Sequence, residues 1–389
     1  MSALLIFAVV LTIAVLLSDL ANRSVLSTAV LFLVAGFVCG RETLGWLPLS
    51  AASPVVSILA ELALFSVLFT DGMRVGARDL LRAWHLPGRA LLLGLPLTLL
   101  FTALLAHWVA GLSWQSAFLV GAVLSPTDPV FAAAIVGRKE IPARLRNLLN
   151  VESGLNDGLA LPIVLVLMAM AAGTPVSGSG LGIEIGAGVL LGIAVPWIGA
   201  KIEQSRFFAI AQSYEPLYAF SLGLLVFALA GMTHANVYLA AFAAGVTVVT
   251  VSTRLRDEFH RFGETVAELF KLAALLVFGA LMSPTLMRDL PWSGYLFALL
   301  ALFVARPVAL GLSLVGSELD LRERVAAAWF GPKGFASVVY GLLLLNAGLP
   351  GAGRMFHLIA LVIAGSILAH SSTDVVIARW FRNEEAAPA

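Results

Sequence analysis

The chain has 389 residues, of which 60% are hydrophobic and only 12% are charged, and its formal net charge is +1. A soluble domain typically carries about 25% charged residues, so this composition excludes a compact water-soluble fold and predicts an integral membrane protein. The net charge gives no indication of a nucleic-acid partner, and the single cysteine, Cys39, excludes an intramolecular disulfide.

Apolar runs of about 18–25 residues are expected to cross the membrane as helices, because a helix satisfies its own backbone hydrogen bonds in lipid. We count about thirteen such runs, which predicts an all-α polytopic membrane fold in a single domain, residues 1–389, with no soluble domain. The first run has no basic residue before Arg23, so we expect a retained span and not a cleaved signal peptide. The runs lie near residues 3–20, 24–40, 54–72, 88–110, 114–136, 146–172, 179–200, 215–232, 236–251, 264–283, 293–316, 324–346 and 355–380.

The basic residues predict the orientation. Of the 24 lysines and arginines, 18 fall in one set of alternate loops and 3 in the other, while Lys271, Arg306 and Lys333 lie inside runs. Loops rich in basic residues face the cytoplasm, so we expect the N-terminus outside and the C-terminus in the cytoplasm. The short tail after Arg382 favours a bacterial inner-membrane protein.

Two runs contain sequences that break helices. In run 114–136 the motif "SPTDPV" contains Pro126 and Pro129, which cannot donate backbone hydrogen bonds, and "GPKG" at 331–334 interrupts run 324–346. The two runs cross the membrane in opposite senses, and paired broken helices are typical of transporters built from inverted repeats. We expect these helices to cross, with Asp128 near their positive N-terminal ends and Lys333 near their negative C-terminal ends.

A group of polar residues lies in the apolar run 146–172, within "LNVESGLNDGLALP". A carboxylate at mid-span disfavours insertion by about 2.5–3.5 kcal/mol, so it marks a functional site by default. At about 100° per residue, Ser153, Asn156 and Asp157 share one face of a helix, and Glu152 lies about 140° from Asp157. Purely helix-packing contacts are the structural alternative for these residues.

Thr127 and Asp128 stand at the first break, where hydroxyl, carboxylate and freed carbonyl oxygens are the hard ligands that small cations prefer. The alternative for Asp128 is a helix cap that never touches an ion. An unpaired arginine in the middle of run 293–316 would make membrane insertion very unfavourable. We therefore expect Arg306 to form a structural ion pair with Glu152, and a gating role for these residues is the alternative. Asp157 would then be the acid that is free to titrate.

Together, "SPTDPV" about twenty residues before "ESGLNDG", the thirteen runs and Arg306 resemble the monovalent cation:proton antiporters of the NhaP and sodium/proton-exchanger branch, over nearly the whole chain. The resemblance implies a homodimer and a structural Glu152–Arg306 pair. It also implies a core around 88–200 and 293–380, with the remaining helices serving dimerisation. Many relatives carry arginine where Lys333 stands, and the Asn-Asp pair marks the electroneutral branch. The implied cation and proton site comprises Asp157, Asn156, Ser153, Thr127 and Asp128.

A mechanism follows from the residues themselves. Desolvation favours a protonated carboxyl group and a bound cation favours the ionised form, so one buried acid can hold a proton or a cation but not both well. We therefore predict a secondary transporter, not an enzyme, that exchanges Na⁺, Li⁺ or K⁺ for H⁺, one for one, without a cofactor. It would serve sodium tolerance and pH homeostasis.

Three other functions compete with exchange. A cation channel and a potassium-selective antiporter are the alternatives, but no filter sequence of the channel type is visible. An intramembrane protease is disfavoured by the absence of a glycine-x-glycine-aspartate signature and of HExxH. Several further polar residues are expected to be mainly structural; they are Glu61, Asp71, Glu184, Glu268, Lys271, His357 and His370.

Overall fold

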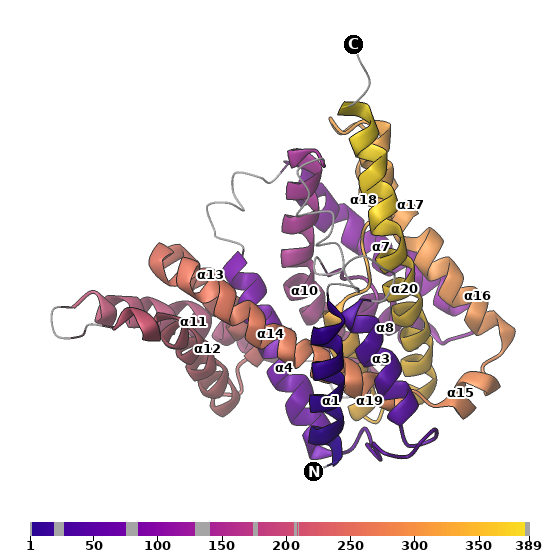
Figure 1. The fold of residues 1–389 in the computed structure, drawn as a ribbon, viewed down its shortest axis with the longest axis horizontal. Helices are drawn as coiled ribbons and strands as arrows, with labels where there is room; N and C mark the ends of the chain where they lie inside the picture. Colours follow the sequence, from indigo (N-terminus) through magenta and orange to yellow (C-terminus); the bar gives the residue numbers. More distant parts are fainter. Residues whose placement is uncertain are drawn as a thin grey trace. The chain divides into compact units, whose positions relative to one another are not determined.

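The structure is a computed structural model that describes residues 2–18, 27–74, 85–128, 141–173, 178–205, 208 and 210–385. All regular structure in these ranges is helical (Figure 1). The elements are α1 (Ser2–Leu16), α3 (Thr28–Cys39), α4 (Pro54–Arg74), α6 (His85–Arg89), η1 (Ala90–Gly94), α7 (Leu95–Trp108), α8 (Trp114–Val123), α10 (Ala143–Ala171), α11 (Gly178–Glu203), η3 (Gln212–Tyr214), α12 (Glu215–Met232), α13 (Val237–Val251), α14 (Thr253–Leu281), α15 (Pro284–Asp289), α16 (Trp292–Leu300), η4 (Ala301–Ala305), α17 (Arg306–Ser313), α18 (Leu321–Trp329), α19 (Phe335–Asn346) and α20 (Ala352–Glu385).

The predicted all-α membrane fold is confirmed. In the described ranges, seven helices are long and apolar enough to cross a membrane, and five shorter apolar helices accompany them. Each of the thirteen predicted runs contains a helix, although the count of thirteen spans stays a prediction. Pro129 of the first breaking motif and the basic loops at 75–84 and 129–140 lie outside the described residues.

Two compact units share the chain. Unit 1 comprises residues 1–60, 85–156 and 272–389, and unit 2 comprises residues 61–84 and 157–271. Three helices, α4, α10 and α14, run from one unit into the other. The predicted division into a core and a dimerisation part uses other bounds and stays a prediction.

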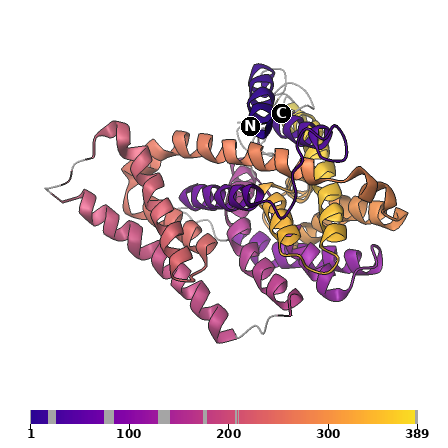
Figure 2. The same cartoon turned by 90° about the horizontal axis from the view of Figure 1, so that it is seen from below.

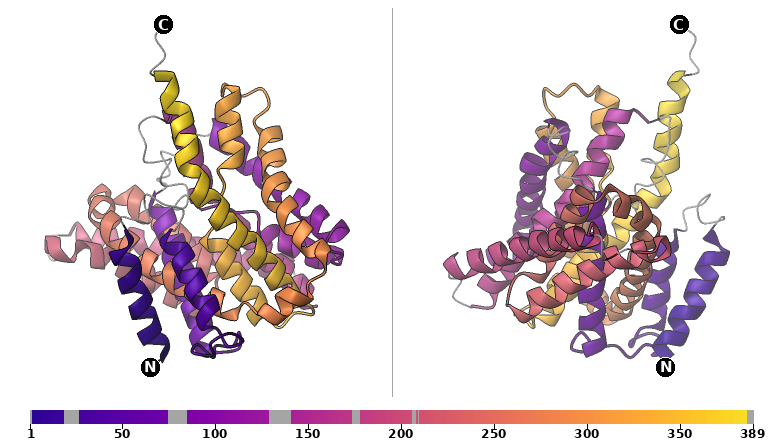
Figure 3. Two further views of the ribbon diagram at one scale, coloured as in Figure 1. Left: turned by 45° about the vertical axis from the view of Figure 1, so that its right-hand side comes forward. Right: turned by 90° about the vertical axis from the view of Figure 1, so that its left-hand side faces the viewer.

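Within unit 1, α20 is the longest helix, with 34 residues. It packs against α16 and α19, and Figure 3 shows it in yellow with α16 alongside in orange. Its buried side includes Phe356, Ile359 and Ile363. This helix therefore packs along both α16 and α19 of unit 1.

Two helices of unit 1 contain a wide π-helical turn at equivalent places. Turn η1 precedes Pro96, and turn η4 precedes Pro307. A proline within a helix cannot donate to the carbonyl one turn earlier, and its ring crowds that carbonyl, so the preceding turn widens. The two bulged helices pack against each other, with Gly94 against Leu310 and Ser313.

Unit 2 is a helical group in which α11, α12 and α13 pack side by side (Figure 2). The contact between α4 and α13 is close at two reciprocal glycines: a Cβ at Gly72 would overlap the Phe242 carbonyl, and a Cβ at Gly245 would overlap the Phe69 carbonyl. Small residues allow such approach between membrane helices. Phe65 stacks on Phe69 beside this contact, with ring centroids 5.9 Å apart, so the core of unit 2 is aromatic and closely packed.

Candidate functional site

The first part of the site is a pair of non-helical segments in unit 1. Helix α8 ends at Val123 and residues 124–128 are extended or irregular. Helices α18 and α19 are separated by residues 330–334, which form no helix. We call these residues segment 330–334. The Asp128 N–H donates to the Pro332 carbonyl at 3.1 Å, so the two irregular segments lie directly against each other.

Asp128 lies at the beginning of α19, as expected. Its Oδ2 accepts from the Phe335 N–H at 3.1 Å, at the positive end of that helix. The approach is so close that a Cβ added to Gly334 would overlap the Cβ of Asp128. Ser337 of α19 contacts the end of α8, because its hydroxyl donates to the Val123 carbonyl at 2.7 Å. The end of α8 and the beginning of α19 are thus joined at three points.

Next to this junction, three predicted residues form a buried cluster of polar groups that we call the hydroxyl–amide cluster. Asn156 donates through Nδ2 to Thr127 Oγ1 at 2.7 Å, and that oxygen lies 3.3 Å from Ser153 Oγ. All three side chains are buried. The Oδ1 of Asn156 has no hydrogen-bond partner among the described residues, so the cluster holds a buried acceptor oxygen that lacks a donor.

Asp157 follows Asn156 in α10, at the residue where the chain enters unit 2. Its side chain is 2% exposed. Helix geometry places it one helical step, about 100°, from Asn156. The predicted titrating acid is therefore a buried group beside the hydroxyl–amide cluster in sequence.

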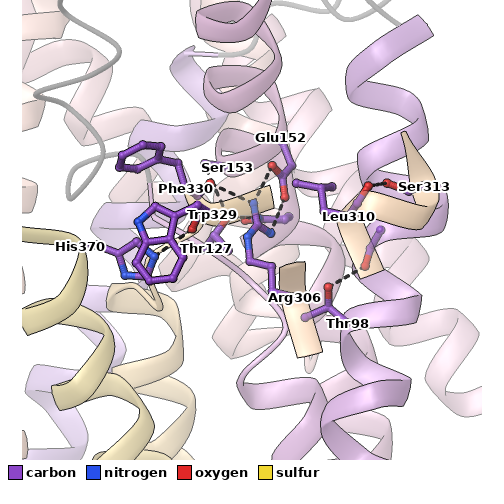
Figure 4. Close-up of polar contacts among 12 residues, drawn as sticks. Thr98, Thr127, Glu152, Ser153, Arg306, Leu310, Ser313, Trp329, Phe330 and His370 are labelled. Carbon is purple, nitrogen blue, oxygen red and sulfur yellow. Dashed lines mark hydrogen bonds and ion pairs between the residues drawn. The ribbon is translucent and has the colours of Figure 1, made fainter. Parts of the chain in front are cut away.

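The expected ion pair between Glu152 and Arg306 is present (Figure 4). Arg306 Nη1 lies 2.8 Å from Glu152 Oε1, and Nη2 lies 3.0 Å from Oε2. Both side chains are buried, and this two-bond geometry is the strong form of the arginine–carboxylate contact. Arg306 Nη2 also donates to the Phe330 carbonyl at 3.1 Å. The pair therefore connects α10 and α17 with segment 330–334.

Two residues of segment 330–334, Gly331 and Lys333, have buried surroundings that limit which side chains fit there. A Cβ at Gly331 would overlap Nε of Arg306, so the guanidinium lies on bare backbone. Lys333 is 2% exposed, and its Nζ has no hydrogen-bond partner in the described part of the chain. Its backbone N–H donates to Ser366 Oγ at 2.7 Å. The predicted position of Lys333 at the negative helix ends stays a prediction.

Two further polar residues, Asp71 and His357, make contacts away from segment 330–334 and the hydroxyl–amide cluster. Asp71 lies in the last turn of α4 and pairs with Arg74 at 3.2 Å, and Arg74 also pairs with Glu264 of α14 at 2.9 Å. Asp71, which was expected to be mainly structural, is thus part of an ion-pair network. His357 accepts from the Ser283 N–H at 3.0 Å, which is the ordinary polar contact that we expected.

Sequence reasoning missed the serines that support the site, Ser337 and Ser366. Each is a single hydroxyl in an apolar run, and such residues are common in membrane helices, where they often bond to their own backbone. Only the contact across elements distinguishes these two. A helical position gives the face on which a hydroxyl lies, but not the carbonyl or N–H that it meets.

Three comparisons bear on this geometry. The family model described as "Sodium/hydrogen exchanger, transmembrane" matches residues 6–380. The K(+)/H(+) antiporter NhaP2 of Shewanella baltica is 26% identical over 98% of this chain and 67% of its own length. The K(+)/H(+) antiporter NhaP of Alkalimonas amylolytica is 24% identical over the same shares. In structure, the chain is similar to the sodium proton antiporter MjNhaP1 from Methanocaldococcus jannaschii at pH 8, with a TM-score of 0.81, 19% identity, and coverage of 97% of this chain and 99% of that one.

Proposed function

Because the chain belongs to the sodium/hydrogen exchanger family of cation/proton antiporters, we propose that it exchanges a monovalent cation for H⁺ at a site formed by Asp157 and the hydroxyl–amide cluster. The supporting observation is the buried Asn156 Oδ1, an acceptor oxygen for which the described residues provide no donor, beside Thr127 and Ser153. Leaving a buried acceptor unsatisfied costs about 1–3 kcal/mol, and a bound cation would offset that cost.

Competition at Asp157 would couple the two ions. A bound cation stabilises the ionised carboxylate, whereas desolvation favours the protonated form. Either ion would therefore displace the other, and a change of access between the two sides of the membrane would complete the exchange. Asp128 would contribute chiefly through the junction with α19, where its Oδ2 already accepts a main-chain N–H.

The same charges support an exchange of one proton per cation. Glu152 is neutralised by Arg306, so Asp157 would be the acid that changes its proton. One positive charge would move in each direction, and the transport cycle would carry no net charge. A voltage effect on the rate in vesicles would contradict this stoichiometry.

The cation stays open between sodium, lithium and potassium. The two relatives named above are called potassium/proton antiporters and the structural neighbour is called a sodium proton antiporter, so potassium is a second candidate substrate. Oxygen ligands suit all three ions, and cavity size and ligand number decide among them. A series of the three chlorides in one vesicle preparation would rank them.

For the molecule as a whole, we propose thirteen spans arranged as inverted repeats, with two broken helices meeting at segments 124–128 and 330–334. The protein would be a homodimer in a bacterial inner membrane, with the N-terminus outside. The core would occupy residues around 88–200 and 293–380. The dissociation of a detergent-solubilised sample on dilution would test the dimer.

The decisive experiment uses inverted membrane vesicles with an imposed proton gradient and a pH-sensitive dye. Adding the cation should collapse the gradient for the wild type and not for Asp157→Asn, because the amide cannot exchange a proton. Glu184→Gln, a change at an exposed acid of α11, is the matched control and should keep full activity.

Full activity of Asp157→Asn would overturn the proposed mechanism. A cation current that flows without any proton movement would favour a channel, the other function class that the composition allows. Equal amounts of each variant in the membrane fraction must accompany both results.

A further inference from the structure

Helix α20 carries two histidines whose ring nitrogens have different neighbours. His357 Nδ1 lies 2.6 Å from the carbonyl of Gly353, four residues earlier, and its Nε2 faces the Ser283 N–H at 3.0 Å. One neighbour accepts and the other donates. A neutral imidazole with its proton on Nδ1 satisfies both contacts, so His357 has no need of a second proton.

His370 repeats the first contact and reverses the second. Its Nδ1 lies 2.8 Å from the carbonyl of Ser366, again four residues earlier, but its Nε2 lies 2.9 Å from the carbonyl of Trp329. A carbonyl oxygen only accepts, and a neutral imidazole has one N–H. Only the imidazolium form can donate to both carbonyls.

The neutral form of His370 still has one acceptable arrangement. With its proton on Nε2 it donates to Trp329, and Nδ1 then accepts from the Ser366 hydroxyl, which lies 3.2 Å away. The carbonyl bond at Ser366 is lost in that state. Gaining a proton therefore exchanges one contact with a hydroxyl for a second bond to a carbonyl.

These contacts hold both ends of segment 330–334. Trp329 is the last residue of α18, so its carbonyl belongs to the negative end of that helix, where a cation is favoured. Ser366 Oγ accepts from the Lys333 N–H at 2.7 Å. Between these two points, Pro332 accepts from the Asp128 N–H. A continuous set of contacts thus leads from His370 to the residue next to Thr127.

His370 is buried, and burial by itself favours the neutral ring. From α17 and from segment 330–334, Arg306 and Lys333 act against a positive charge on His370. Arg306 is itself neutralised by Glu152 of α10. The end of α18 acts in favour of the charge, because its Trp329 carbonyl accepts from Nε2. No other charged group among the described residues acts on this imidazole.

We propose that His370 is a positioning residue that responds to protons. As an imidazolium it ties the end of α18 to α20 through both ring nitrogens, and as a neutral ring it keeps only one of these carbonyl bonds. The tighter state restrains segment 330–334, and through Asp128 it holds the proposed cation ligands in place. Acid conditions, in which protons compete most strongly for Asp157, are then the conditions in which the rest of the site is best ordered.

The transport test rests on the proposed function and measures KM for the preferred cation from about pH 5 to about pH 8, a window that extends below the ordinary range of histidine because this ring is buried. His370→Gln keeps an N–H donor for Trp329 but cannot change its charge. We expect it to match the wild type at the alkaline end. At the acid end we expect its KM to exceed that of the wild type by about three- to tenfold, the range that one hydrogen bond gives. His357→Gln is the matched control on the same helix and should follow the wild type throughout.

A second variant and a second signal keep the test independent of transport. Trp329 stacks on His370 with ring centroids 5.1 Å apart, so a protonated imidazole should quench its fluorescence. Subtracting the spectrum of Trp329→Phe isolates this emission. We expect a pH-dependent fall that is absent in His370→Gln. In Ser366→Ala its midpoint should lie at higher pH, because the hydroxyl donor that serves the neutral ring is gone.

Each outcome decides the question. Emission from Trp329 that does not titrate, or an unmoved midpoint in Ser366→Ala, would overturn the proposal. Emission that titrates while the KM of His370→Gln runs parallel to that of the wild type would also overturn it, because His370 would then gain a proton without positioning the site. A wild type that shows no exchange would instead refute the proposed function, and the fluorescence would still decide whether His370 takes up the proton.

Discussion

At the scale of single residues, two buried carboxylates of α10 are predicted to have different roles. Glu152 is held by a guanidinium with two bonds, and Asp157, five positions further along α10, is buried without a basic residue within four positions of it in the sequence. Helical periodicity predicts that the two acids lie on different faces; the Glu152–Arg306 pair is confirmed, and the role of Asp157 stays a prediction. The sequence could not predict the contact of Arg306 with Phe330, since that contact depends on the path of a non-helical segment.

The ion pair gives a prediction of stability. Glu152→Gln should destabilise the protein in detergent by about 3–5 kcal/mol, because Arg306 would remain charged and buried. The midpoint of thermal unfolding measures the change. The double variant Glu152→Leu with Arg306→Met removes both charges and should be more stable than the single variant. If the loss of stability in the double variant equals the sum of the losses in the two single variants, the two charges contribute independently.

At the scale of elements, the sequence predicted where the helices are interrupted, but it did not predict which contacts the interrupted segments make. Pro332 and the two glycines of the same motif predict an interrupted helix. The structure has this interruption, because no helix connects Trp329 to Phe335. Composition could not show why glycine is required at each place. Gly331 leaves room for a guanidinium and Gly334 leaves room for Asp128. Both reasons come from neighbours that are distant in sequence.

Gly334 therefore supports a prediction about the junction of the two breaks. Gly334→Ala should lower exchange strongly and destabilise the protein by about 1–3 kcal/mol, because the added methyl group overlaps Asp128 and overpacking has this cost. Vesicle exchange and thermal unfolding measure the two effects.

Gly311→Ala is the control for this change. It lies in α17, where an added Cβ meets nothing within 4 Å, and the variant should behave as the wild type. Wild-type exchange by Gly334→Ala would mean that the junction can rearrange without loss.

At the scale of the whole molecule, hydropathy was sufficient for the fold class, because lipid permits few solutions for a buried backbone. It did not predict the π-helical turns before Pro96 and Pro307, which arise from prolines that resemble those elsewhere in the apolar runs. It also did not predict where the chain passes between the two units. The passages at 156–157 and at 271–272 lie inside continuous helices, and a helix interior carries no boundary signal in its sequence.

The orientation is a prediction of the same scale. In a Cys39→Ser background, Ala52→Cys should react with a membrane-impermeant maleimide in intact cells, because the sparsely basic loops are expected outside. Ala387→Cys should react only after the cells are permeabilised. Labelling with the opposite pattern would invert the topology, and mass-shift gels would record either result.

The guanidinium that lies on Gly331 has a consequence for motion. Arg306 is bonded to Glu152 of α10 and to the Phe330 carbonyl, and no space separates its Nε from the backbone beneath it. A sliding of α17 past both α10 and the broken helix would have to rupture a bidentate charge pair and a carbonyl bond in one step. These three parts of unit 1 should therefore travel as a single block during any transport cycle, and the pivots should be sought elsewhere in the chain.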